Sequence, residues 1–338
     1  MMHPGELSPG RAAIAVARAG LPQLDVRIGA PDLRPFLAGN SLPGVWSFAG
    51  PEAGPHVAIV ALTHGNEIGG AVVLERWLRE GLRPARGRLS LVFANTAAFS
   101  RFDPEDPTAS RFIDEDLNRL WDEETLEGGR RSCELSRARV LRPLFDTVDV
   151  LLDLHSMLWP SDPLILSGRP QRARELALAV GIPPLVVADQ GHTGGRRLID
   201  YTPFADVAGM RTAVLVEAGA HWEAATVAMT EACAARLLRL TGIVAHDDPI
   251  LPQPAVAADA LGTPRLAEVT RTITARTRGF AFIRPFRGGE VVPQRNTLIA
   301  LDGEEEIRTP HDDCLLVMPS LRTTPGHTAV RLARFVPR

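Results

Sequence analysis

The sequence predicts an α/β fold, with a mixed, largely parallel sheet flanked by helices and a smaller C-terminal all-β domain. Between residues 57 and 240, short apolar runs typical of buried strands alternate with helical runs, as in sheets covered by helices on both faces. Residues 246–264 are rich in Pro, Ala and Asp, which is the composition of a linker. Beyond them, short strands separated by glycine turns indicate a small β domain.

The elements of the first domain can be assigned in order. Residues 1–50 are irregular and rich in Pro and Gly, and they predict only a lead-in or an edge strand. We expect strands at 57–62, 89–94, 148–154, 185–188 and 213–216, and helices at 71–80, 132–145, 171–180 and 223–240. A chain of 338 residues exceeds what one hydrophobic core usually organises. We therefore expect a first domain over 1–245, a linker over 246–264 and a β domain over 265–338.

Composition and charge exclude several classes of protein. The net charge of −3 shows no bias towards nucleic acid, and no apolar run is long enough to cross a membrane. The first residues lack the pattern of a secretory signal, so we expect a cytoplasmic protein. All 37 basic residues are arginine, which excludes lysine chemistry such as a pyridoxal phosphate Schiff base. Three dispersed cysteines argue against disulfides and against a cysteine-based zinc site.

Two histidines and two glutamates stand where predicted strands end. His64 and Glu67 lie in the loop THGNEIGG, His155 follows VDVLLDL, and Glu217 follows TAVLV. Ligands of an open α/β sheet bind beyond the carboxyl ends of its strands, so these residues can converge. Imidazole and carboxylate bind Zn²⁺ well, and three protein ligands leave a fourth position open for water. The first three residues therefore predict one zinc ion per chain, although each alone would more often be an ordinary polar group.

The segment SRFIDEDLNRLW crowds polar residues between the first two of these strands. Arg111, Asp116, Asn118 and Arg119 alternate there with apolar residues, so the segment must pack while it presents its polar groups together. Arginine suits bidentate binding of a carboxylate, and it can also polarise a carbonyl oxygen. The alternative is a solvated loop, which the charges alone would favour.

The chain resembles the succinylglutamate desuccinylase and aspartoacylase family, relatives of the zinc carboxypeptidases. The matching stretches THGNE, SRFIDEDLNR, DLHS and VEAG occur in the family's order within residues 55–225. The resemblance implies a zinc-carboxypeptidase-like sheet, with residues 1–245 as a zinc hydrolase domain. The later stretches GFAFIRPFRGGEVV, NTLIALDG and PGHTAVRL look like the biotinyl-type, barrel-like module that family members append, here without a lysine for attachment.

The resemblance also implies roles for the residues of the predicted metal site. His64, Glu67 and His155 would bind the zinc ion, and Glu217 would be the general base and acid that handles the water. Asp153 lies two positions before His155, so both side chains point to the same side of a strand. Asp153 could therefore orient that ligand, although a plain structural role is equally compatible with the sequence.

Further roles follow for the polar segment. Asn118 and Arg119 would hold the carboxylate of the amino-acid half of the substrate, and Arg111 would polarise the scissile amide carbonyl. Asp116 could support one of these residues, and a plain structural role is equally compatible with the sequence. The resemblance gives no role to His221, which is expected to be structural or to support a ligand. The side chains without a clean match to the family are His192, Arg196, Arg197, Tyr201 and Arg211.

The predicted function is zinc-dependent hydrolysis of the amide bond of an N-acyl amino acid or a related small amide. Its partner would be that small-molecule substrate, with neither nucleic acid nor membrane involved, and a homo-oligomer stays open. Two alternatives remain: a zinc carboxypeptidase acting on short peptides, and a catalytically inactive metal-binding or scaffold protein. The retained Glu217 argues against the last, because a structural zinc needs no free base and prefers four protein ligands.

Overall fold

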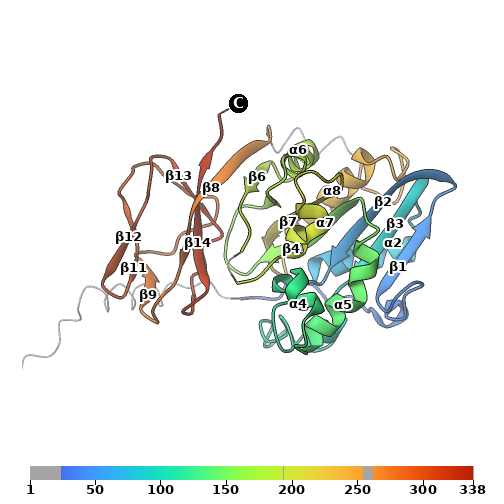
Figure 1. Cartoon of the computed structure of the whole chain (residues 1–338), viewed down its shortest axis with the longest axis horizontal. Helices are drawn as coiled ribbons and strands as arrows, with labels where there is room; N and C mark the ends of the chain where they lie inside the picture. The colour runs from blue at the N-terminus through green and yellow to red at the C-terminus, as the bar shows by residue number, and fades with distance from the viewer. Residues whose placement is uncertain (1–23, 193, 254–261, 338) are drawn as a thin grey trace, which may run out of the picture. The chain divides into compact units, whose positions relative to one another are not determined.

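The computed structural model describes residues 24–192, 194–253 and 262–337, which form two compact units (Figure 1). The larger unit consists of Asp25–Ser156 and Pro163–Leu266, and the smaller consists mainly of Met157–Asp162 and Ala267–Arg338. Most of the expected lead-in, 1–23, and part of the expected linker, 254–261, lie outside the described residues. The division at 245 and 265 stays a prediction.

The sheet of the larger unit is mixed, as predicted. Its strand order is β1-β3-β2-β4-β7-β5-β6, with β1 at the edge. β2 pairs in parallel with β3 and β4, and β5 pairs in parallel with β6. β1 is antiparallel to β3, and β7 is antiparallel to β5. The strands are β1 Val45–Ala49, β2 Glu52–Ala61, β3 Arg86–Phe93, β4 Val150–Met157, β5 Leu164–Ser167, β6 Leu185–Ala188 and β7 Thr212–Ala220.

The helices of this unit cover an apolar core. α2, α6 and α8 contact one another and pack on the sheet, where buried side chains such as Ile59, Trp77, Ile165 and Leu237 meet. The four long helices agree with the predicted ones, whereas three helices of four or five residues were not predicted. The helices are α2 Gly69–Glu80, α3 Thr96–Phe99, α4 Glu123–Glu127, α5 Cys133–Phe145, α6 Gln171–Val180, α7 Thr202–Ala205 and α8 Ala224–Leu240, and the 3₁₀ turns are η1 Arg34–Phe36, η2 Leu117–Arg119 and η3 Leu198–Asp200.

Two strands run further than the sequence predicted. β4 continues to Met157 and β7 to Ala220, so His155 and Glu217 lie inside strands and not just beyond them. The reason is that a polar side chain does not end a strand whose backbone still has a pairing partner. Glu217, for example, stands opposite Leu164 of β5, a strand that the sequence analysis did not identify.

The regular elements in the described residues of the smaller unit are all strands, as predicted. One antiparallel sheet has the order β8-β14-β13-β10 and another has the order β12-β11-β9, around a core that includes Phe282, Ile299 and Leu332. The segment before β5 joins this unit, because the N–H of Asp162 donates to the carbonyl of Gly288 at 2.8 Å. The strands are β8 Arg265–Thr274, β9 Phe280–Phe282, β10 Val291–Val292, β11 Leu298–Asp302, β12 Glu305–Arg308, β13 Cys314–Val317 and β14 Thr328–Phe335.

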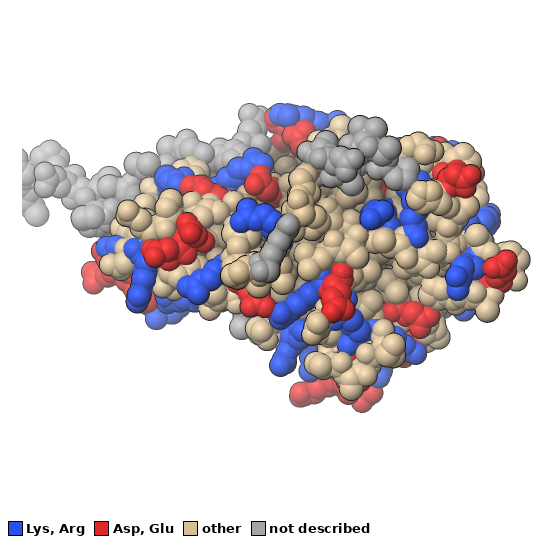
Figure 2. Space-filling view, turned by 90° about the horizontal axis from the view of Figure 1, so that it is seen from above, with Lys and Arg blue, Asp and Glu red and all other residues tan. Residues whose placement is uncertain are grey.

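Three further observations concern the surface, the helices and the cysteines. On the face shown in Figure 2, acidic and basic side chains are interspersed. Among the described residues, no helix combines the length and the apolar character needed to cross a bilayer. The three cysteines are free thiols, and Cys233 and Cys314 are buried.

Candidate active site

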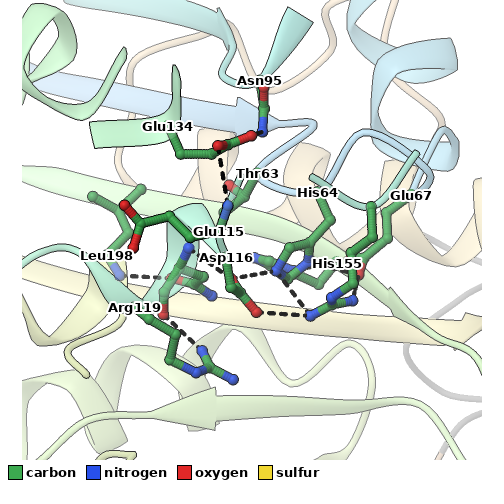
Figure 3. Close-up of polar contacts among 12 residues, drawn as sticks. Thr63, His64, Glu67, Asn95, Glu115, Asp116, Arg119, Glu134, His155 and Leu198 are labelled. Carbon is green, nitrogen blue, oxygen red and sulfur yellow. Dashed lines mark hydrogen bonds and ion pairs between the residues drawn. The ribbon is translucent and has the colours of Figure 1, made fainter. Parts of the chain in front are cut away.

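The three predicted metal ligands lie together in the larger unit (Figure 3). One donor atom of each of His64, Glu67 and His155 lies within 4.8 Å of the other two, and all three residues are buried. Nδ1 of His64 lies 2.7 Å from one oxygen of Glu67, and Nδ1 of His155 lies 2.9 Å from the other. Both imidazoles therefore face the same carboxylate.

The tight loop between β2 and α2 carries two of these ligands. Gly65, which follows His64, packs directly on the backbone of the neighbouring segments. A Cβ atom at Gly65 would lie 2.5 Å from the backbone nitrogen of Phe99, so only glycine fits there. The N–H of Gly65 donates to the carbonyl of Arg111 at 3.0 Å. This bond joins the ligand loop to the polar segment SRFIDEDLNR.

Asp153 supports the third ligand from within β4. Its Oδ2 lies 2.8 Å from Nε2 of His155, on the side of the ring away from Glu67. The hydroxyl of Thr63 donates to the other oxygen of Asp153 at 2.8 Å. Burial alone would lower the pKa of His155, but the carboxylates of Asp153 and Glu67 raise it well above its usual range. Asp153 thus lies on the same side of β4 as His155, as the spacing of two residues predicted.

Asp116 stands in the same relation to His64. Its Oδ1 lies 2.9 Å from Nε2 of His64. Burial alone would raise the pKa of Asp116, but the charges of His64 and Arg111 hold it well below its usual range. A carboxylate at Nε2 favours the tautomer whose Nδ1 lone pair is available to a metal. The set of two Nδ1 atoms and one carboxylate, with an aspartate behind each imidazole, therefore fits a zinc ion.

Arg111 lies at the rim of this cluster. Its guanidinium donates to Glu67 at 3.2 Å and to Asp116 at 3.2 Å, and its Nη2 lies 2.9 Å from Nε2 of His64. The side chain is 37% exposed, so a small molecule can still reach it. Burial alone would lower the pKa of Arg111, but Asp116, Glu67 and Glu217 raise it. The guanidinium is therefore a permanent positive charge beside the predicted ligands.

Asn118 and Arg119 lie in the turn η2, which Asp116 caps. The carboxylate of Asp116 accepts the backbone N–H of Asn118 at 2.8 Å. The side-chain oxygen of Asn118 accepts the N–H of Leu198 at 2.7 Å, which leaves its amide NH₂ as the donor that a substrate could use. Arg119 donates to the carbonyl of Asn118 at 2.6 Å. The predicted pair thus belongs to an ordered turn beside the cluster.

Glu134 is an organising residue that the sequence analysis missed. It lies in the first turn of α5, and its carboxylate is completely buried. It accepts the backbone N–H groups of Ile113, Asp114 and Glu115 at 2.7, 3.0 and 3.3 Å. The amide of Asn95 donates to it at 3.0 Å. The sequence signal, an acidic residue two positions after a serine cap, indicated only a helix start.

Glu217 and His221 come from β7 and the residues that follow it. Glu217 is buried, and its charge contributes to the raised pKa of Arg111, which places it close to the cluster. His221 is also buried, and its Nδ1 lies 2.7 Å from the hydroxyl of Ser156, the neighbour of His155. The sequence analysis did not identify Ser156.

Two residues without a match to the family have structural partners. Arg197 is buried and binds both Asp189, at 3.0 Å, and Asp200, at 2.6 Å. Its charge is therefore already compensated inside the protein. Tyr201 is buried as well, and its hydroxyl donates to Asp146 at 2.6 Å. Tyr201 is thus packed inside the protein and bound to Asp146.

Comparison with known proteins identifies a family that part of the chain resembles. Residues 53–202 match the model of the succinylglutamate desuccinylase/aspartoacylase catalytic domain. This stretch of the chain is therefore similar to the catalytic domain of that family. The matched region contains the three clustered ligands and the whole segment SRFIDEDLNR, whereas Glu217 lies beyond its end.

Two named proteins are similar in sequence to parts of this chain. An aspartoacylase from Xenopus tropicalis is 33% identical over 30% of this chain and 33% of its own length. A probable aspartoacylase from Parasynechococcus marenigrum is 37% identical over 41% of this chain and 48% of its own. The chain thus spans between a third and a half of these two family members.

The solved structures extend the similarity of the fold to most of the chain. A succinylglutamate desuccinylase from Vibrio cholerae superimposes with a TM-score of 0.67 at 17% identity, covering 87% of this chain and 86% of its own. Another from Vibrio parahaemolyticus gives a TM-score of 0.65 at 18% identity, covering 87% of each chain. At these identities the likeness shows a common fold.

Glu134→Gln should destabilise the protein, because a glutamine places an N–H₂ group against backbone N–H donors in a buried site. We expect the free energy of unfolding, measured by urea denaturation, to fall by about 1–3 kcal/mol. Glu127→Gln is the matched control, because the Glu127 side chain is 66% exposed and pairs with Arg142 at the surface. Equal, small effects of the two substitutions would contradict the anchoring role of Glu134.

Proposed function

We propose that the protein is a zinc-dependent amidohydrolase that cleaves the amide bond of an N-acyl amino acid or a related small amide. One observation carries the proposal: His64, Glu67 and His155 converge, and Arg111 stands beside them. The match to the family's catalytic-domain model and the similarity to an aspartoacylase support it. The cytoplasmic location and the oligomeric state stay predictions from the sequence.

The donor set suits a catalytic metal. Two imidazoles and one carboxylate leave a coordination position for water or substrate, whereas structural zinc sites usually have four protein ligands. A zinc ion supplies Lewis acidity and lowers the pKa of bound water to about 7. Within the described residues, His64, Glu67 and His155 are the one group of histidine, cysteine and acidic side chains with metal-binding spacing.

The residues around the ligands can perform the remaining steps. Glu217 would accept a proton from the attacking water and return it to the nitrogen of the departing amine. Arg111 would donate to the carbonyl oxygen as negative charge grows on it. Asn118, through its amide NH₂, and Arg119 would hold the carboxylate of the substrate.

A substrate panel tests the proposed function. Zinc-loaded protein is incubated with N-acetyl, N-succinyl and N-formyl amino acids and with short peptides that have a free C-terminus, and the released amine is quantified. The proposal expects hydrolysis of N-acyl amino acids in preference to peptides. Preferential release of C-terminal residues from the peptides would favour a carboxypeptidase, and no hydrolysis by zinc-replete protein would favour a binding protein.

Glu217→Gln should keep the fold and the zinc ion but lose proton transfer. We expect kcat to fall by ~10²–10⁴-fold, the usual contribution of a positioned general acid–base group. Steady-state kinetics with the zinc content measured on the same sample check this. A zinc-replete variant with a near-normal rate would remove Glu217 from the mechanism.

Arg111→Ala and Arg119→Ala should reduce the activity through different kinetic constants. Arg119, as a carboxylate binder, contributes mainly to ground-state binding, so its loss should raise KM more than it lowers kcat. Arg111 faces charge that develops only in the transition state, so its loss should lower kcat by about 10²–10³-fold. Kinetics on both variants, with zinc content checked, make the comparison. Mild and equal effects would contradict both roles.

A further inference from the structure

Two consecutive residues after β7 contact the segments that carry the predicted ligands. Nδ1 of His221 lies 2.7 Å from the hydroxyl of Ser156, and the indole N–H of Trp222 donates to the carbonyl of Asn66 at 2.8 Å. Both side chains are buried, with relative exposures of 5% and 3%. The ligand loop and β4 are thus each bound to the same short segment.

The two residues that are contacted are sequence neighbours of the predicted ligands. Asn66 precedes Glu67 in the loop, and Ser156 follows His155 in β4. In addition, the backbone N–H of Ser156 donates to Oε2 of Glu67 at 3.1 Å, the oxygen that also faces His155. Through Ser156, His221 therefore acts on the orientation of both Glu67 and His155.

The backbone of Trp222 points to a functional constraint. Its φ is +61°, in the left-handed region that bulky residues rarely adopt. The conformation is held from several directions, because the carbonyl of Trp222 accepts the N–H of Arg27 at 3.1 Å and the ring packs near Phe102 and His221. An ordinary surface turn would not require a bulky residue in this backbone conformation.

His221 can occupy this position without repelling a cation. Burial lowers the pKa of His221 to about 4, so the imidazole is neutral at physiological pH. A neutral ring can exchange one hydrogen bond with the hydroxyl of Ser156 and adds no positive charge near His64 and His155.

We propose that His221 and Trp222 are positioning residues that hold Glu67 and His155 in the arrangement that binds zinc. The inference rests on the metal site of the proposed function, and it concerns metal affinity before any reaction. It predicts that the two residues affect zinc binding more than they affect folding.

The test is the zinc dissociation constant of the full-length protein, measured by competition with a chelator. His221→Leu removes the bond to Ser156, and Trp222→Phe removes the indole N–H while keeping the ring. We expect each to weaken zinc binding by about 10–100-fold, as is typical when a partner of a metal ligand is lost. His221→Asn should recover part of the affinity, because its amide lies near the position of Nδ1.

Matched controls separate positioning from general stability. His56 is a buried histidine whose Nε2 lies 2.8 Å from the hydroxyl of Ser90, and the indole of Trp77 donates to Glu231 at 3.1 Å. His56→Leu and Trp77→Phe should lower the unfolding temperature without changing zinc affinity more than about twofold.

The outcomes distinguish this inference from the proposed function. Zinc affinities within twofold of wild type for His221→Leu and Trp222→Phe, or losses equal to those of the controls, would overturn the positioning role. Wild-type protein that binds zinc but hydrolyses no N-acyl amino acid would contradict the proposed function alone, because affinity is measured without substrate. Wild-type protein that binds no zinc would contradict both. The spectrum of the cobalt-substituted protein should also change in His221→Leu and stay constant in His56→Leu.

Discussion

The carboxylate of Glu67 is buried between two imidazoles, and the surrounding structure compensates its charge. Nδ1 of His64 and Nδ1 of His155 face its two oxygens, and the guanidinium of Arg111 and the N–H of Ser156 donate to them. Burial alone would raise the pKa of Glu67, but the two histidines hold it well below its usual range. A buried charge is tolerated only when it is paired, so the loop, β4 and the polar segment must meet here.

Further carboxylates extend this organisation outward. Asp116 contacts His64, binds Arg111 and caps the turn that carries Asn118, so one side chain links the predicted metal site to the predicted substrate-binding turn. Glu134 holds the backbone just before that turn. These hydrogen bonds explain why the segment SRFIDEDLNR, with its many charged residues, is ordered beside the predicted metal site and is not a solvated loop. As a consequence, each buried carboxylate depends on hydrogen-bond partners from other elements.

The sequence predicted those features that depend on local pattern. The apolar runs before His64 and His155 identified β2 and β4, and the short spacing of His64 and Glu67 predicted that they share a site. The pairing of distant elements could not be predicted in this way, because periodicity determines the type of an element but not its neighbours. The bond between His221 and Ser156 joins residues 65 positions apart, and the role of Glu134 depends on backbone groups that carry no side-chain signal.

Metal analysis of the purified protein is the direct test of the predicted zinc site. We expect about one zinc ion per chain in the wild-type protein, in keeping with a three-ligand set of His64, Glu67 and His155. It also predicts that His64→Ala and His155→Ala each lose this stoichiometric zinc while His56→Ala, which removes a buried histidine outside the set, retains it. Wild-type protein without stoichiometric metal when zinc is supplied, or His64→Ala and His155→Ala variants with wild-type zinc content, would contradict the account.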